Sequence, residues 1–137
     1  CRASEQVIAF SYIAFDICIQ GWGALMTRSR WITEMGLGVD VHGSDYTKAG
    51  KRAISDALRH SSLSFFQATD KSVDQMHVQV IIGAAQPDLI DTAELAREVP
   101  YGTVEVTVTS GGLDVLSEDG SDQITMVNAA ILVSFLD

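Results

Sequence analysis

The most apolar of the expected strands is residues 123–136, QITMVNAAILVSFL, which contain no charged side chain. A strand in which nearly every side chain is apolar needs cover on both of its faces. We therefore expect helices to cover one face of the sheet that holds this strand. Its other face also includes apolar residues, and self-association can supply the second cover.

Earlier stretches alternate between apolar and other residues, which is the pattern of strands. They are residues 30–41, 76–85 and 103–109. We expect Leu113–Leu116 to continue the third of these strands. Gly36 and Gly38 interrupt the first strand, which predicts either a bulge or a close approach of another backbone.

Two helices are predicted between the strands. Residues 44–60 can be capped by Ser44 or Asp45, and their apolar face consists mostly of small residues: Gly50, Ala53, Ile54, Ala57 and Leu58. Such a face predicts that the helix lies close against a sheet. A short helix begins at Asp91, with Glu94 placed as in a capping box. The order β-α-β-α-β-β predicts an α+β fold whose mixed sheet carries its helices on one face.

Charge and cysteine content exclude several classes of protein. The chain has 137 residues, of which 9 are Lys or Arg and 18 are Asp or Glu, so its formal net charge is −9. Nucleic acids and anionic membranes bind basic surfaces, so we expect neither as a partner. Cys1 and Cys18 are the only cysteines. No disulfide can therefore tie the rest of the chain, which indicates a reducing, cytoplasmic location.

The first residues differ in character from the rest. Residues 1–25 show no clear helix or strand periodicity, whereas caps and turns follow Met26. We expect residues 1–25 to be an extension that is non-native or packs as an apolar arm, and residues 26–137 to form a single domain.

Basic residues gather where the first strand is expected to turn into helix 44–60. Lys48, Lys51 and Arg52 fall in the first turns, although the partial positive charge of a helix N-terminus disfavours each cation there by about 0.3–1 kcal/mol. A bound carboxylate or phosphate would explain their placement. The alternative is an ordinary charged helix face that pairs with its own neighbours: Asp45, Ser55 and Asp56.

Candidate site residues surround the same turn. The predicted ligand-binding residues are Gly36, Gly38, Asp40, Gly43, Lys48, Arg52, Tyr101 and Asn128. His42 and Asp45 are the candidate acid/base pair, because histidine is the side chain best suited to exchange a proton at neutral pH and Asp40 or Asp45 could orient it. The alternative for His42 is a loop histidine bonded to the backbone. Asn128 interrupts an apolar strand, so its amide either ties a neighbouring strand or reaches a ligand. Tyr101 either lines the same edge of the sheet as Asn128 or packs on the core.

Several well-defined motifs are absent. Val41 stands where a dinucleotide fingerprint needs its third glycine, and no phosphate-binding GK[ST] ending, HExxH or GxSxG sequence occurs. Asp40, His42 and Asp45 lie on a turn rather than on one helix face, so no metal and no cofactor are expected.

The run from Met35 to Leu63, MGLGVDVHGSDYTKAGKRAISDALRHSSL, resembles the signature of a small bacterial family of conserved hypothetical proteins, named from a listerial reading frame. Pro100–Gly102, Gly111-Gly112 and Val127–Ala130 are similar to its later blocks, so the resemblance covers residues 30–135 and leaves 1–25 outside. It implies no settled activity.

The element order is more distantly similar to trimeric Rid (YjgF-like) and Bacillus-type chorismate mutase folds, and to units of ring-opening amidohydrolases. That similarity implies a homotrimer with ligand clefts between subunits, but no catalytic residue of those folds is matched. The leading interpretation is an uncharacterised protein that binds or converts a small anionic metabolite in such clefts. The alternative is a non-catalytic assembly or accessory subunit, and whether the protein is an enzyme stays open.

Overall fold

The computed structural model describes residues 27–60 and 70–136, so the predicted extension 1–25 lies outside the described residues. Within them, Arg30–Phe135 form one compact unit. The strands are β1 (Arg28–Asp40), β2 (His77–Ala84), β3 (Thr103–Ser110), β4 (Leu113–Leu116) and β5 (Gln123–Leu136). The helices are α2 (Tyr46–Arg59) and α4 (Thr92–Ala96), with 3-10 turns η1 (Val73–Gln75) and η2 (Pro87–Leu89).

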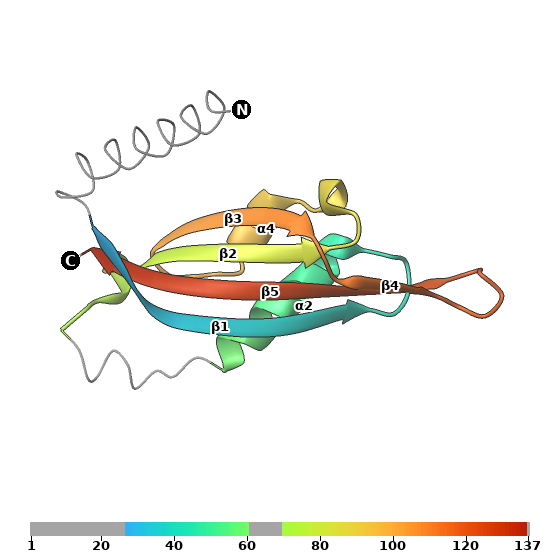
Figure 1. Ribbon diagram of the computed structural model, residues 1–137, viewed down its shortest axis with the longest axis horizontal. Helices are drawn as coiled ribbons and strands as arrows, with labels where there is room; N and C mark the ends of the chain where they lie inside the picture. The colour runs from blue at the N-terminus through green and yellow to red at the C-terminus, as the bar shows by residue number, and fades with distance from the viewer. Residues whose placement is uncertain (1–26, 61–69, 137) are drawn as a thin grey trace, which may run out of the picture. The chain divides into compact units, whose positions relative to one another are not determined.

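The sheet is mixed, with strand order β1-β5-β2-β3 and β4 paired to β5. The central strand β2 is parallel to β3 and antiparallel to β5, so Val80 lies between Val106 on one side and Ile131 on the other. The arrows of β1 and β5 point in opposite directions, and both helices lie on one side of the sheet (Figure 1). The predicted α+β fold, with helices on one face of a mixed sheet, is confirmed.

The expectation that Leu113–Leu116 continue the third strand is wrong. After Ser110 the chain crosses the end of β2 and joins β5, with Leu113 opposite Met126. Gly112 makes this turn possible, because its φ is 64° and a Cβ there would lie 2.2 Å from the carbonyl oxygen of Met126. The element order therefore gains a strand and becomes β-α-β-α-β-β-β.

Helix α2 lies directly on β1. A Cβ on Gly38 would lie 1.9 Å from the carbonyl oxygen of Ala49, and one on Gly36 would lie 2.2 Å from that of Ala53. Any other residue would push the helix away. Of the two interpretations of these glycines, the close approach of another backbone is confirmed. The small side chains on the apolar face of α2 let the helix lie close against the sheet, as predicted.

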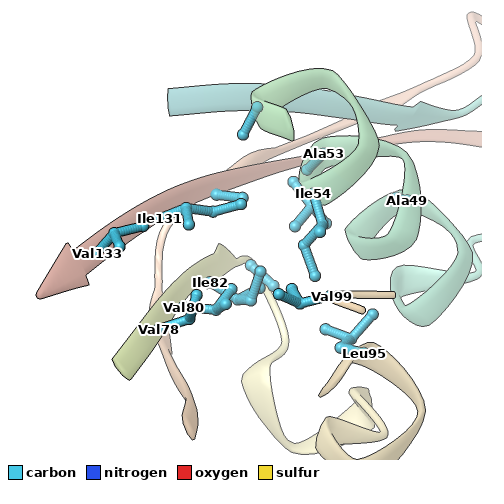
Figure 2. Close-up of a cluster of buried hydrophobic side chains, with 14 of the residues drawn as sticks. Ala49, Ala53, Ile54, Val78, Val80, Ile82, Leu95, Val99, Ile131 and Val133 are labelled. Carbon is cyan, nitrogen blue, oxygen red and sulfur yellow. The ribbon is translucent and has the colours of Figure 1, made fainter. Parts of the chain in front are cut away.

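The core lies between the sheet and the two helices. Figure 2 shows the valines and isoleucines of β2 and β5 facing Ala53 and Ile54 of α2. Leu95 of α4 is fully buried beside them. Helix α4 begins at the predicted residue, because the Asp91 carboxylate accepts the backbone N–H of Glu94 at 3.1 Å.

The side of the sheet away from the helices is called the open face here, and it carries several exposed apolar side chains. Since Gly36 and Gly38 face α2, the alternate residues Met35 and Leu37 lie on the open face. By the same alternation the open face also carries three residues of β4 and β5: Leu113, Val115 and Ile124. Among the described residues, no helix has the length and apolar character needed to cross a membrane.

Candidate functional site

The junction between β1 and α2 is built around the buried carboxylate of Asp40, which is 1% exposed. Its Oδ2 accepts the backbone N–H of Asp45 at 3.0 Å. Its Oδ1 lies 3.2 Å from the Nζ of Lys48 and 3.7 Å from the Nη1 of Arg52. The end of β1 thus places the Asp40 carboxylate at the N-terminus of α2, between Lys48 and Arg52. These are two of the three basic residues whose position in the first turns was unexpected.

Asp40 is held in its ionised form. The backbone N–H of Asp45 does most to lower the pKa of this carboxyl, and burial opposes it; Lys48 and Arg52 add to the lowering. The side chains of Lys48 and Arg52 remain 50% and 49% exposed. One carboxylate therefore faces two cations, and the cluster keeps one net positive charge towards solvent.

Two side chains of α2 also bond the outer edge of β1. The Nη1 of Arg52 donates to the carbonyl oxygen of Val39 at 2.5 Å. The Oδ2 of Asp56 accepts the backbone N–H of Leu37 at 3.0 Å. We call these two bonds the edge contacts, and they occupy backbone groups that a neighbouring strand would otherwise use.

Lys51 does not join the Asp40 cluster. Its Nζ contacts the carboxylate of Glu94 and lies 3.9 Å from that of Glu98. These contacts raise the pKa of Lys51, with Glu94 the largest cause. Lys51 thus links α2 to α4, whereas the sequence offered only partners within α2 and its cap.

His42 has a different partner from the two that the sequence suggested. Its Nδ1 lies 2.5 Å from the Oδ2 of Asp122, in the turn between β4 and β5. Asp45 instead caps α2 by accepting the N–H of Lys48 at 3.0 Å. The contact with His42 is the main cause that lowers the pKa of Asp122. The imidazole is 83% exposed, so a solute could reach it.

A buried polar cluster lies next to this junction, and none of its members was predicted. The hydroxyl of Tyr46, which is 2% exposed, donates to the Asp114 carboxylate. The Nε2 of Gln123 donates to that hydroxyl at 3.4 Å and to the Oγ1 of Thr125 at 3.2 Å. Burial, followed by Asp114, raises the pKa of Tyr46. The other oxygen of Asp114 is buried without a hydrogen-bond partner in the described part of the chain.

The remaining predicted site residues lie elsewhere or have other roles. Gly36 and Gly38 are covered by the backbone of α2, whereas Gly43 lies beside the Asp40 carboxylate with a φ of 89°. The Oδ1 of Asn128 accepts the backbone N–H of Gly112 at 2.9 Å and so ties β5 to the turn between β3 and β4, while its contact with a ligand stays a prediction. Tyr101 lies away from the junction, on a pocket at the C-terminal end of α2.

Comparisons with known proteins agree with the fold and name no activity. A family model described as a conserved hypothetical protein, Lin0512, matches residues 30–133. No curated protein matches the chain. The 1.22 Å crystal structure of an FtsZ-like protein of unknown function from Nostoc punctiforme PCC 73102 is similar, with a TM-score of 0.70 and 28% identity. The similarity covers 82% of this chain and 99% of that chain. The similarity to Rid-like and chorismate mutase folds stays a prediction.

Proposed function

The chain belongs to the Lin0512 family of conserved hypothetical proteins, a membership that carries no activity, and we propose from its geometry that it is a non-catalytic subunit that assembles with its own copies through the open face of the sheet. The observation that carries this proposal is that the open face exposes several large apolar side chains and is almost free of charge. We propose three copies, the number that the resemblance to trimeric folds implies.

The apolar side chains of the open face supply part of the driving force. Five of them are about half exposed or more: Met35 at 66%, Leu37 at 45%, Leu113 at 53%, Val115 at 49% and Ile124 at 45%. Full burial stabilises such a side chain by about 1.5–3 kcal/mol, so covering what is exposed would contribute on the order of 4–7 kcal/mol. Association itself costs about 4–15 kcal/mol. Two copies that covered these side chains on each other would gain roughly 8–14 kcal/mol, which is comparable to that cost, so contact over more of the face favours a stable assembly.

The rest of the open face allows that larger contact, because it is nearly uncharged. Along the outward-facing positions of the strands from Trp31 onward, Glu105 is the only acidic residue and no Lys or Arg occurs. The carboxylate of Glu105 lies 3.9 Å from the Nε2 of His77. The chain has a net charge of −9, and the open face is a surface through which two copies can pack with little repulsion between carboxylates.

The edge contacts favour the face over the strand edge as the site of assembly. A strand that added to β1 would need the backbone N–H of Leu37 and the carbonyl of Val39, which Asp56 and Arg52 already bond. Displacing them would leave a carboxylate and a guanidinium without these partners. Packing on the open face disturbs neither bond.

Light scattering of Met35→Glu tests the proposal. We expect the parent to have a multiple of the 14.8 kDa chain mass at micromolar concentration and the variant to be a monomer, because its new carboxylate would be buried at the contact. The control is Leu89→Glu in η2, since Leu89 is 59% exposed and does not lie on the sheet. Far-ultraviolet circular dichroism verifies the fold of each. A monomeric parent, or a Met35→Glu variant that assembles like the parent, would contradict the proposal.

A second candidate function, which we also propose, is the binding or conversion of a small anionic metabolite at the Asp40 cluster. The observation that favours it is the net positive charge of Lys48 and Arg52 around one carboxylate, in a chain of net charge −9. His42 is exposed beside the same junction, where it would serve as the acid or base if a reaction occurs. The N–H groups at the start of α2 would add to the attraction.

Titration with inorganic phosphate tests this second candidate. A hydrogen bond to a charged group contributes about 1.5–3 kcal/mol, so Lys48→Ala is expected to weaken phosphate binding roughly 10- to 100-fold. Lys51→Ala is the matched control, because Lys51 pairs with Glu94 instead. If Lys48→Ala binds phosphate as the parent does, the candidate is wrong.

A further inference from the structure

A pocket of about 460 Å³ lies between the sheet and the C-terminal end of α2. Sites for small molecules commonly measure roughly 300–1,000 Å³. The pocket is separate from both surfaces described above, because it lies at the far end of α2 from Asp40 and on the helix side of the sheet. Neither proposed function uses it.

The wall of the pocket is apolar because the sheet extends past the end of the helix. α2 ends at Arg59, whereas β2 and β5 continue to present their helix-facing side chains. Three of these, Val78, Ile131 and Val133, line the pocket together with Met76, which directly precedes β2, and all four are at most 7% exposed. A molecule held here would place its apolar part against these side chains, out of water.

The charged groups at the pocket are mainly acidic. Glu34 and Glu98 both line it, together with Arg59. The positive charge of Arg59 is already matched, because its Nη2 lies 3.0 Å from the Oδ1 of Asp56. Lys51 lies 3.9 Å from Glu98 but contacts Glu94 more closely.

The position of the pocket adds to the negative potential that these carboxylates create. The C-terminal end of a helix carries a partial negative charge, and the pocket lies at that end of α2. The net charge of −9 also raises the concentration of cations near the surface. The same two carboxylates and the C-terminal end of α2 would repel an anionic ligand.

We infer that this pocket binds a small amphipathic cation. Its apolar body lies against the β2 and β5 side chains, and its ammonium or guanidinium group lies at the carboxylates of Glu34 and Glu98. The inference rests on apolar walls and two carboxylates in the lining of one cavity, and it requires no reaction.

Paired probes with one alkyl chain and opposite head groups test this inference. Decyltrimethylammonium and decyl sulfate are titrated calorimetrically into the full chain below their micelle-forming concentrations. We expect the cation to bind at least tenfold more tightly than the anion. Glu34→Gln is expected to weaken binding of the cation at least threefold and to leave that of the anion unchanged or tighter. Glu105→Gln, which removes a carboxylate on the open face, is the control and should change neither.

Nuclear Overhauser contacts locate the probe without any substitution. We expect contacts between the decyl chain and the methyl groups of Val78 and Val133. Absence of binding, equal affinity for the two probes, or contacts confined to open-face residues such as Leu37 would each overturn the inference.

Discussion

Replacing Asp40 with Asn removes one negative charge from between two cations and changes little in shape. The amide oxygen can still accept the N–H of Asp45, but the charge-assisted contacts with Lys48 and Arg52 are lost. We expect the free energy of unfolding at pH 7 to fall by about 1–3 kcal/mol, as measured by urea denaturation. The control is Asp45→Asn, because Asn also caps helices and should change stability by only a few tenths of a kcal/mol.

The same residue predicts a pH dependence. The pKa of Asp40 is lowered in the folded protein, so its ionised form stabilises the fold fully above the unfolded-state pKa of about 3.9. That stabilisation is lost as the pH falls through the lower, folded-state pKa. The difference in unfolding free energy between the parent and Asp40→Asn should therefore be constant from pH 6 to 7 and shrink below about pH 4. A difference that grows on acidification would contradict this account.

Asn128 offers a residue-scale test of the crossing from β3 to β4. Asn128→Ala removes the acceptor of the Gly112 N–H, and we expect a loss of about 1 kcal/mol in unfolding free energy. Amide hydrogen exchange at Gly112 should become faster in the same variant. Asn128→Asp retains an acceptor oxygen and is expected to keep the amide protected. Equal exchange in the parent and Asn128→Ala would show that the bond contributes nothing.

At the scale of elements, the contact between β1 and α2 is the least tolerant of change. Gly38→Ala would place a methyl group 1.9 Å from the Ala49 carbonyl oxygen, so the helix must move away from the sheet. Overpacking of this kind typically lowers the free energy of unfolding by about 1–3 kcal/mol. Because this clash is with backbone atoms, we expect a loss of about 3 kcal/mol or more. Gly120→Ala is the comparison, because nothing lies within 4 Å of it and only its φ of 72° disfavours alanine. Thermal unfolding should separate the two variants clearly.

The elements themselves were predictable where local pattern and packing agree. The alternation of β2 and the small face of α2 follow from the side chains that the core needs, so sequence periodicity located both. The partner of β4 could not be predicted in this way. Its four residues alternate equally well beside β3 or β5, and the choice is made by the backbone turn at Gly112.

Separation along the chain explains which contacts of the site were predicted. Asp40, Lys48 and Arg52 are close in sequence, so a strand-to-helix turn is enough to bring them together. The contact of His42 with Asp122 spans 80 positions and requires the hairpin of β4 and β5. Asp114 reaches Tyr46 through the same hairpin, which is why the buried polar cluster was missed.

At the scale of the whole molecule, the net charge of −9 predicts how assembly responds to salt. In the assembly that we propose, copies meet through a nearly uncharged face and repel one another through the rest of their surfaces, and salt screens that repulsion. Raising sodium chloride from about 0.05 to 0.5 M should therefore tighten self-association by roughly threefold or more, as measured by sedimentation equilibrium. Assembly through ion pairs would respond in the opposite direction.

The edge contacts also bear on the fate of a partly opened molecule. Asp56 and Arg52 belong to α2, so they leave β1 whenever that helix detaches. Detachment then uncovers the core and at the same moment frees the Leu37 N–H and the Val39 carbonyl as a template for a foreign strand. Aggregation should accordingly begin from molecules that have lost α2 alone, and its rate should follow the local opening of this helix rather than complete unfolding.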